Sequence, residues 1–301
     1  MKKKSRTAAT NLSLFLIALP GIIYLLINNY APMLGIFLAF KNYSLMKGPF
    51  KSDWCGFDNF EFLFKTKDAW IMTRNTLLYN TAFIIIGTVA AILVAILMCE
   101  LGEKKRVKFY QAVMLLPNLL SWVVIGFIAY AFLNADTGFI NNTFLRWLGL
   151  DPVAWYSTPG AWPIILVIVN LWKNVGYQSI IFMAAISGID KSLFEAAAID
   201  GCRPAGTFFK IVMPISKTVY ATVFILDFVA HWNDFMWPFL VMTGEDKRTI
   251  QLAVQSFFGT QPVHYSAIMA ALVISAIPMI IMFIFMQKYY VEGIASSGIK
   301  G

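Results

Sequence analysis

Long runs without charged residues alternate with shorter polar segments along the chain. Three runs, 7–40, 75–99 and 109–135, contain no charged side chain. Each exceeds the roughly 20 residues that a helix needs to cross a bilayer core. Two further apolar runs accept a few ionisable groups, and a sixth, 266–286, is free of them. Because these runs are continuous and do not alternate with period two, they predict helices and not a β-barrel.

The pattern therefore predicts an all-α polytopic membrane protein with six transmembrane helices. We expect the spans at about 12–40, 76–99, 109–133, 161–185, 217–242 and 266–286, within a membrane domain 12–286. Residues 1–11 and 287–301 are expected to be tails, and 187–216 a long loop. Prolines can end or kink helices, here Pro20, Pro117, Pro163, Pro238 and Pro278. The composition, 59% hydrophobic and 13% charged, excludes a water-soluble single domain.

Basic residues are unevenly distributed between the two sides of this predicted topology. The two tails, the second loop and the fourth loop hold 14 of the 24 Lys and Arg residues. By the positive-inside rule, these segments face the cytoplasm. We therefore expect cytoplasmic N- and C-termini. The net charge of +8 is explained by this asymmetry and by anionic lipid at the inner leaflet, so no nucleic-acid partner is expected.

Common catalytic and metal-binding motifs are missing from the sequence. The three cysteines and two histidines are too few and too widely spaced for a metal centre. No Gly-Lys dipeptide occurs, so the phosphate-binding motif GxxxxGK[ST] is absent. Neither a nucleophile elbow nor an HExxH helix is found. We expect no catalysis, no metal and no cofactor on this chain, and an energy source on a partner.

The loop between the fourth and fifth spans has a pattern unusual for a connection. Apolar residues recur with helical spacing over 193–198, Asp190 or Ser192 can cap the start, and Gly201 supplies a stop. A second apolar group follows at 208–212. We expect a compact helix, turn and helix whose exposed apolar side chains mark a partner site. The alternative is an amphipathic segment that rests on lipid headgroups.

This loop resembles the EAA loop of permease subunits of binding-protein-dependent ABC importers. The match is Glu195-Ala196-Ala197, then Gly201 after three residues, and Ile211-Val212-Met213-Pro214 after nine more. Methionine replaces the family's usual leucine before the proline, and both are flexible apolar residues of similar size. The resemblance implies a coupling helix that seats in a groove on the ATP-binding subunit. Its implied coupling residues are Phe194, Glu195, Ala196, Ala197, Asp200, Gly201 and Pro214.

The resemblance covers nearly the whole chain and is strongest to the sugar and oligosaccharide branch, which includes the maltose permeases. Residues 56–60 and 75–77 are similar to the larger, first permease subunit, whereas 232–235 and 249–252 resemble the second. This mixture leaves heterodimer and homodimer open. The resemblance implies a multi-pass protein of the bacterial plasma membrane. It also implies that Gln261, Pro262 and His264, before the last helix, contact the binding protein.

The resemblance further implies the partners of the chain. Two ATP-binding subunits would bind ATP and Mg²⁺ and hydrolyse the nucleotide. A second permease subunit would complete the translocation path, an extracytoplasmic solute-binding protein would deliver the sugar, and membrane lipid would surround the assembly. The chain itself would be the pore subunit, which passes the sugar to the cytoplasm by alternating access.

Polar residues inside the spans are a second candidate site. Ionisable groups cost roughly 2.5–3.5 kcal/mol at the centre of a spanning helix and tend to face the bundle interior or a wet pathway. Asp227, His231 and Asp234 fall at i, i+4 and i+7, on one stripe of the fifth span. Sugars are recognised by amide, carboxylate and aromatic groups. The expected pathway residues are Trp172, Asn174, Tyr177, Asp227, His231, Trp232, Asn233 and Asp234.

Two other interpretations of these polar residues remain open at this point. In the first, Asp227 pairs with Lys173 across the bundle and has only a structural role. In the second, Asp227, His231 and Asp234 form the proton or sodium relay of an ion-coupled secondary transporter. That transporter would depend on an ion gradient and would need no ATPase.

Overall fold

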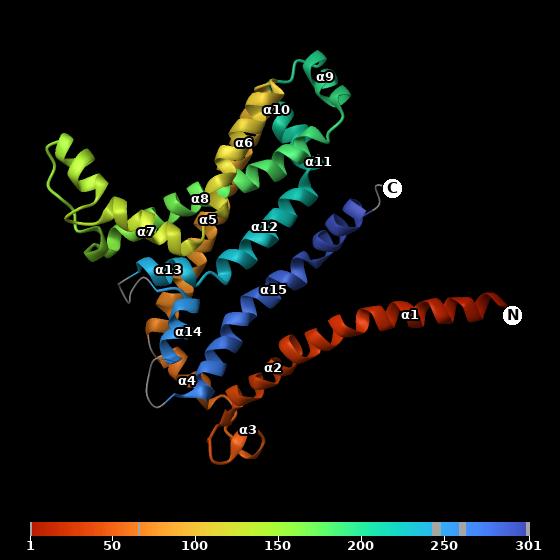
Figure 1. Ribbon diagram of the computed structural model, residues 1–301, viewed down its shortest axis with the longest axis vertical. Coiled ribbons are helices and arrows are strands. Elements are labelled where there is room, and N and C mark those ends of the chain that lie inside the picture. Colours follow the sequence, from red (N-terminus) through yellow and green to blue (C-terminus); the bar gives the residue numbers. More distant parts are fainter. Residues whose placement is uncertain (1, 66, 243–247, 259–262, 299–301) are drawn as a thin grey trace. The chain divides into compact units, whose positions relative to one another are not determined.

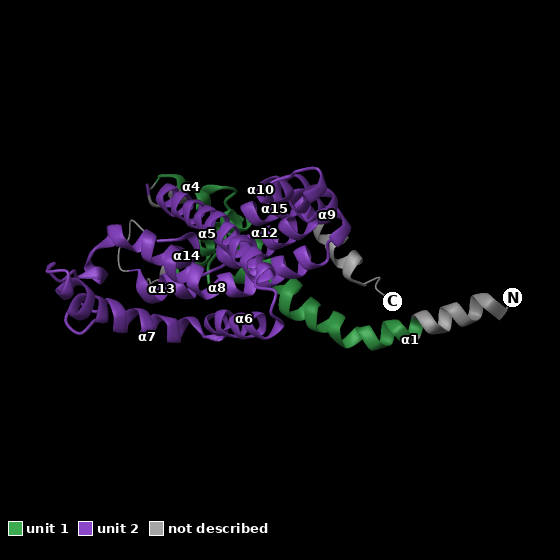
Figure 2. Ribbon diagram, turned by 90° about the horizontal axis from the view of Figure 1, so that it is seen from above, with its two compact units in different colours: residues 1–66, 256–276 green, residues 67–255, 277–301 purple. Residues whose placement is uncertain are grey.

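The computed structural model describes residues 2–65, 67–242, 248–258 and 263–298. They are predominantly helical, which confirms the predicted all-α class (Figure 1). The one sheet among them pairs β1 (Lys41–Asn42) antiparallel with β2 (Asp53–Trp54), with Lys41 opposite Trp54. The chain divides into two compact units, residues 1–66 with 256–276 and residues 67–255 with 277–301 (Figure 2).

Helices long and apolar enough to cross a membrane recur along the described chain. Four are unbroken: Leu14–Phe40, Ala69–Glu100, Pro159–Ser187 and Tyr265–Lys288. Two further candidates are bent pairs, Lys104–Leu119 with Trp122–Leu133 at 95° and Pro204–Ile215 with Lys217–Trp232 at 74°. If each pair is one span, the described residues contain six, the predicted number. The second bent pair includes 204–215, which the sequence pattern assigned to the loop 187–216.

Unit 1 begins with a continuous helical rod. It comprises α1 (Lys2–Leu25), the π-helical η1 (Leu26–Tyr30), α2 (Ala31–Met33) and the 3₁₀-helical η2 (Leu34–Phe40). After β1 follow α3 (Gly48–Lys51), β2 and α4 (Asp58–Lys65). A small core of Ala39, Phe60 and Ala270 joins η2 and α4 to the start of α15 (Tyr265–Gly298).

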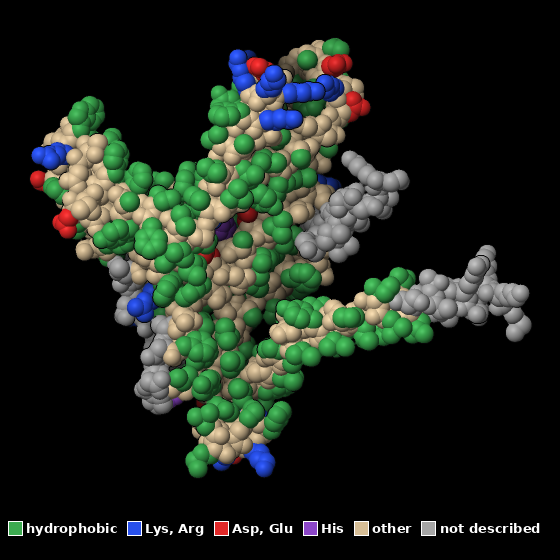
Figure 3. All heavy atoms as spheres, viewed as in Figure 1, with side chains coloured by type: hydrophobic (Ala, Val, Ile, Leu, Met, Phe, Trp, Pro, Cys, Tyr) green, Lys and Arg blue, Asp and Glu red, His purple; other side chains and the backbone are tan. Residues whose placement is uncertain are grey.

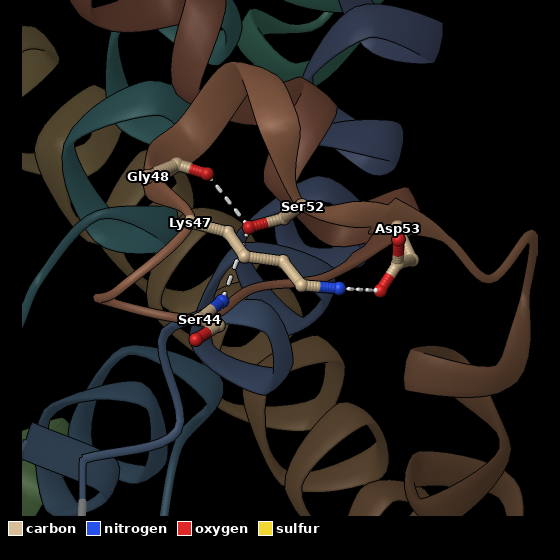
Figure 4. Close-up of polar contacts among 5 residues, drawn as sticks. All are labelled: Ser44, Lys47, Gly48, Ser52 and Asp53. Carbon is tan, nitrogen blue, oxygen red and sulfur yellow. Dashed lines mark hydrogen bonds and ion pairs between the residues drawn. The ribbon is translucent and has the colours of Figure 1, made fainter.

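The loop between β1 and β2 is closed by its own polar contacts (Figure 4). The Ser52 hydroxyl donates to the Gly48 carbonyl at 2.7 Å and accepts from the Ser44 amide at 3.1 Å. Lys47 pairs with Asp53, and this hydrogen bond lowers the pKa of the Asp53 carboxyl. Gly48 has a φ of +73°, a conformation that glycine adopts without strain. These contacts fix a turn on which Leu45, Met46 and Phe50 are exposed.

Unit 2 is built on two long helices, α5 (Lys67–Glu100) and α8 (Trp162–Ser187), which pack along each other. Helix α6 (Lys104–Leu119) packs on α8, α12 (Lys217–Trp232) on both α5 and α8, and α13 (Met236–Val241) on α7 (Trp122–Leu133). The shorter elements are η3 (Ile140–Leu145), η4 (Trp155–Ser157), η5 (Pro159–Ala161), α9 (Lys191–Ile199), α10 (Pro204–Thr207), η6 (Phe208–Val212), α11 (Met213–Ile215) and α14 (Ile250–Phe258). Helix α14 begins in unit 2, and its residues from Ser256 onward belong to unit 1.

The contact between α6 and α8 depends on a glycine. A Cβ atom added at Gly176 would lie 1.9 Å from the Met114 carbonyl oxygen, well inside van der Waals contact. The backbones of the two helices can approach this closely only because no side chain stands between them. Small residues play the same part at many helix contacts in membranes.

Three predicted boundaries differ from the structure. The stretch 109–133 is not one helix, because α6 ends two residues after Pro117 and the Ser121 hydroxyl caps the start of α7 by accepting from the Val124 amide at 3.3 Å. The fifth span, expected to reach 242, ends at Trp232 as α12, and α13 follows after a short break. Helix α15 continues to Gly298, so most of the expected tail 287–301 is helical.

Candidate functional site

The first candidate site is the loop 187–216, where the predicted helix is confirmed as α9. Asp190 caps its start, because the carboxylate accepts a hydrogen bond from the Ser192 amide at 3.0 Å. This backbone hydrogen bond lowers the pKa of the Asp190 carboxyl. The cap satisfies an amide that the helix itself leaves without a partner. Helix α9 therefore starts at a defined residue.

The end of α9 is equally defined. Gly201 has a φ of +71°, and its amide donates to the Ala198 carbonyl at 3.1 Å. The Cys202 amide donates to the Ala197 carbonyl at 2.9 Å. These two bonds form a Schellman motif, which requires a left-handed residue at the position of Gly201. The predicted role of Gly201 as the helix stop is confirmed.

The two faces of α9 differ in their surroundings. Ala197 is 5% exposed and points inward, whereas Ile199 is 87% exposed. Phe194 is half-buried. A cavity of about 690 Å³ lies beside the helix, and its lining includes Phe194, Glu195 and Ala198 from α9. The end of α5 contributes Cys99 and Glu100 to the same cavity. Helix α9 thus has one face on the bundle and one face free.

Most predicted coupling residues lie on the surface. Glu195, Ala196, Asp200, Gly201 and Pro214 are exposed. Leu193, which belongs to the predicted apolar group 193–198, is exposed as well. The sequence pattern missed Ile199, an exposed apolar side chain two residues after the Glu-Ala-Ala triplet, although its apolar character was an available signal. Basic side chains gather over the end of unit 2 where α6 begins and α9 lies (Figure 3).

The second candidate site surrounds the bend between α6 and α7. The Lys173 ammonium on α8 donates to the carbonyl oxygens of Leu120 at 2.5 Å, Asn118 at 3.1 Å and Pro117 at 3.4 Å. It also lies 5.0 Å from the centre of the Trp122 ring. Carbonyl groups at a helix end lack intrahelical partners, and lipid offers none. Lys173 satisfies those carbonyls and thereby supports the bend.

Helices α8 and α12 face each other with polar side chains. The Gln178 amide donates to the Asp227 carboxylate at 2.8 Å, and Asn170 lies 3.4 Å from Nδ1 of His231. The interpretation in which Asp227 pairs with Lys173 is wrong, because Lys173 donates to carbonyl groups and Asp227 accepts from Gln178. Asp227 and His231 do lie on one stripe, as their spacing predicted.

Asp234 does not continue this stripe, because α12 ends at Trp232. Its carboxylate accepts from the Trp237 amide at 3.4 Å, at the start of α13. Asn233 is the C-cap of α12, and its side chain donates to the Val229 carbonyl at 2.9 Å. Trp232 is buried. The expectation of a single stripe is therefore wrong for Asp234, which sits at a helix break.

The predicted pathway residues on α8 point in different directions. Asn174 accepts from the Asn118 side chain at 3.3 Å and belongs to the polar region near the bend. Trp172 and Tyr177 are both about half exposed, and five positions on a helix separate side chains by about 140°. They therefore lie on different faces. Gln178 was not among the predicted residues, although its position one turn after Asn174 was a signal.

The remaining predicted residues belong to the loop before α15. Gln261 and Pro262 lie outside the described residues. His264 is exposed, and its carbonyl accepts from the Ile268 amide at 3.1 Å in the first turn of α15. Within the ranges that the structure describes, no cluster of three or more His, Cys, Asp or Glu side chains has the geometry for a metal ion.

Comparison with known families and proteins connects these features to transport. The family described as "Binding-protein-dependent transport system inner membrane component" matches residues 87–296. Protein LplB of Bacillus subtilis (strain 168) is 29% identical over 237 residues, which are 79% of this chain and 74% of that protein. The polygalacturonan/rhamnogalacturonan transport system permease protein YteP of the same organism is 30% identical over 71% of this chain and 66% of its own length.

Solved structures show the same relationship. A chain from a bacterial ABC transporter involved in the import of the acidic polysaccharide alginate has a TM-score of 0.83 and 27% identity. The similarity covers 99% of this chain and all of that chain. A second alginate ABC transporter structure, in complex with a pentasaccharide-bound periplasmic protein, gives a TM-score of 0.82 at 28% identity over 93% of this chain. The family resemblance predicted from the sequence is confirmed.

Proposed function

Because the chain belongs to the inner membrane components of binding-protein-dependent transport systems, we propose that it takes an oligosaccharide from an extracytoplasmic binding protein and passes it to the cytoplasm. It is a permease subunit of an ABC importer of the bacterial inner membrane and not itself an enzyme. ATP hydrolysis belongs to two partner subunits, which bind ATP and Mg²⁺. A second permease subunit, identical or different, completes the path.

The observation that carries this proposal is α9. Its N-terminal cap and its C-terminal Schellman motif hold a short helix at the surface of unit 2. Its free side presents Ala196 and Ile199, and Leu193 is exposed one turn before the buried Ala197. An exposed apolar face that is fixed in place binds a partner at a low entropic cost. We assign this face to the ATP-binding subunit, with Glu195 and Asp200 at its polar rim.

The orientation of the chain in the membrane follows from the same feature. If α9 contacts a cytoplasmic ATPase, the basic end of unit 2 is cytoplasmic, in agreement with the positive-inside rule. Both tails of the chain then lie in the cytoplasm. The loop before α15, with Gln261, Pro262 and His264, lies on the opposite side and contacts the binding protein.

The substrate pathway is proposed along the polar contacts of α8 and α12. Asn118 and Asn174 lie at the bend of α6 and α7, and Asp227 and His231 lie on α12. Hydrogen-bonding side chains of this kind suit sugar hydroxyl groups. Trp172 and Tyr177 supply exposed aromatic faces, and Trp232, Asn233 and Asp234 shape the end of α12. YteP and the alginate importer, which resemble this chain, support a polysaccharide-derived substrate.

The decisive experiment is purification of the chain from its native membrane in mild detergent, with identification of the proteins that accompany it. We expect an ATP-binding subunit and either a second permease or two copies of this chain. Glu195→Lys should reduce recovery of the ATPase and abolish sugar uptake. The control is Glu103→Lys, which alters an exposed residue paired with Arg106. A chain that purifies alone, with uptake that follows the proton gradient and ignores ATP, contradicts the proposal and favours an ion-coupled transporter.

A further inference from the structure

The segment after α7 turns back sharply at its first residues. The Asn134 side-chain oxygen accepts from the amides of Asp136 at 2.9 Å and Thr137 at 2.8 Å. A Cβ atom added at Gly138 would lie 2.3 Å from the Asn134 carbonyl oxygen, so only glycine fits there. The chain then enters the helical segment that contains η3. The turn is therefore set by side-chain hydrogen bonds and by one close backbone approach.

Asn141 holds the returning segment in place. It is 3% exposed, and its amide donates to the carbonyl groups of Ala135 at 3.0 Å and Val153 at 2.9 Å. Its side-chain oxygen accepts from the Trp155 indole at 3.0 Å. One buried side chain thus ties both ends of the segment 135–153 together. These hydrogen bonds hold the exposed side of the segment in one conformation.

That outward side is apolar. Its exposed large side chains are Phe139, Phe144, Trp147, Leu148 and Leu150, and Trp147 is 80% exposed. Arg146 is the one charged residue between 137 and 150. On a monomeric soluble domain, an apolar surface of this kind would promote aggregation. Its presence here therefore indicates an apolar partner.

The apolar surface is continuous with that of α7. The Phe132 ring near the end of α7 contacts the Phe139 ring at 5.6 Å between centroids. Phe127 and Tyr130, earlier on α7, are also exposed. With α6, α7 forms a pair apolar enough to cross a membrane. The exposed face of 139–150 therefore extends a surface that is itself suited to lipid.

We propose that residues 138–150 form a membrane-interface anchor whose apolar side chains enter the boundary between phospholipid headgroups and acyl chains. Trp147 sits at headgroup level, as tryptophan does in interfacial belts. Phe144, Leu148 and Leu150 enter the acyl region, and Arg146 lies near lipid phosphate. The anchor fixes the end of α7 relative to the bilayer. This inference requires only that the chain is a membrane protein and is independent of the sugar or the ATPase.

Site-directed spin labelling of the importer reconstituted in phospholipid vesicles tests the anchor. Cys55, Cys99 and Cys202 are replaced by serine, and single labels are introduced through Phe144→Cys, Trp147→Cys and, as a control outside the anchor, Lys105→Cys at an exposed lysine of α6. Labels at 144 and 147 should collide with oxygen several-fold more often than with a water-soluble nickel complex. The label at 105 should show the opposite preference.

Three results overturn the proposal. Labels at 144 and 147 that are open to the nickel complex place the segment in water. Labels shielded only after addition of the binding protein identify a protein docking surface. Labels shielded from both reagents identify a contact with another permease subunit. If the substituted chains do not assemble, the unmodified importer in vesicles of photoactivatable phospholipid gives the same answer, because an anchor requires lipid cross-links within 139–150.

Discussion

The ammonium group of Lys173 lies 2.5 Å from the carbonyl oxygen of Leu120, the residue at which α6 gives way to the bend before α7. A cation at this end of a helix also interacts favourably with the helix dipole. The break in the third span is thus supported from α8, 53 residues along the chain. The bend therefore depends on a side chain that is distant from it in sequence.

Replacement of Lys173 should weaken the fold of unit 2. In Lys173→Met, the carbonyls of Asn118 and Leu120 lose the ammonium donor, whereas the Pro117 carbonyl keeps its bond from the Leu120 amide. Each buried unsatisfied group costs about 1–3 kcal/mol. We expect a lower midpoint of thermal unfolding in detergent. Lys105→Met, which alters an exposed lysine on α6, is the control and should leave the midpoint unchanged. An unchanged midpoint for Lys173→Met would contradict the supporting role of the ammonium group.

Gly176→Ala should separate α6 from α8. The new methyl group would meet the Met114 carbonyl at 1.9 Å, and a backbone atom cannot move aside without displacing its helix. We expect a large loss of folded protein, measured by size-exclusion chromatography of the detergent extract. Gly160→Ala is the matched control, because a Cβ atom there has no neighbour within 4 Å. Equal yields of the two variants would show that the close approach is not required.

The exposed apolar face of α9 should carry part of the binding to the ATPase. Ile199→Asp places a charge where the side chain is 87% exposed, so the chain itself should fold normally. A hot-spot residue contributes about 2 kcal/mol or more, which corresponds to roughly a 30-fold loss of affinity. Affinity between the purified permease and the ATP-binding subunit measures this effect. Unaltered affinity would exclude Ile199 from the contact.

The N-terminal cap of α9 should weaken in acid. The Asp190 carboxyl has a lowered pKa in the folded chain because the Ser192 amide donates to the carboxylate. A lowered folded pKa gives stability that is complete above the ordinary value of about 3.9 and disappears as the pH falls through the folded pKa. Hydrogen-exchange protection of the first turn of α9 should therefore fall below about pH 4. Asp190→Asn removes the titrating carboxyl, so protection in this variant should not change with pH. An equal fall in both chains would refute the role of the cap.

Much of the site at α9 could be predicted because its determinants are local. The cap at Asp190 and the stop at Gly201 lie within a few residues of the helix that they define. The polar site near the bend was less predictable. The carbonyl partners of Lys173 come from a distant segment, and a sequence does not show which segment will approach. The helical spacing that placed Asp234 on one stripe with Asp227 applies only within a continuous helix. Helix α12 ends at Trp232, before Asp234.

The hydrogen bonds at both ends of α9 affect how the helix can move. The Ser192 amide donates to Asp190, and the carbonyls of Ala198 and Ala197 accept from Gly201 and Cys202, so both ends of α9 are restrained against fraying. If the free face of α9 binds the proposed ATP-binding subunit, a displacement of that subunit is expected to move the helix as one body. The displacement would then pass to α8 and α10, the helices that precede and follow α9 in the chain.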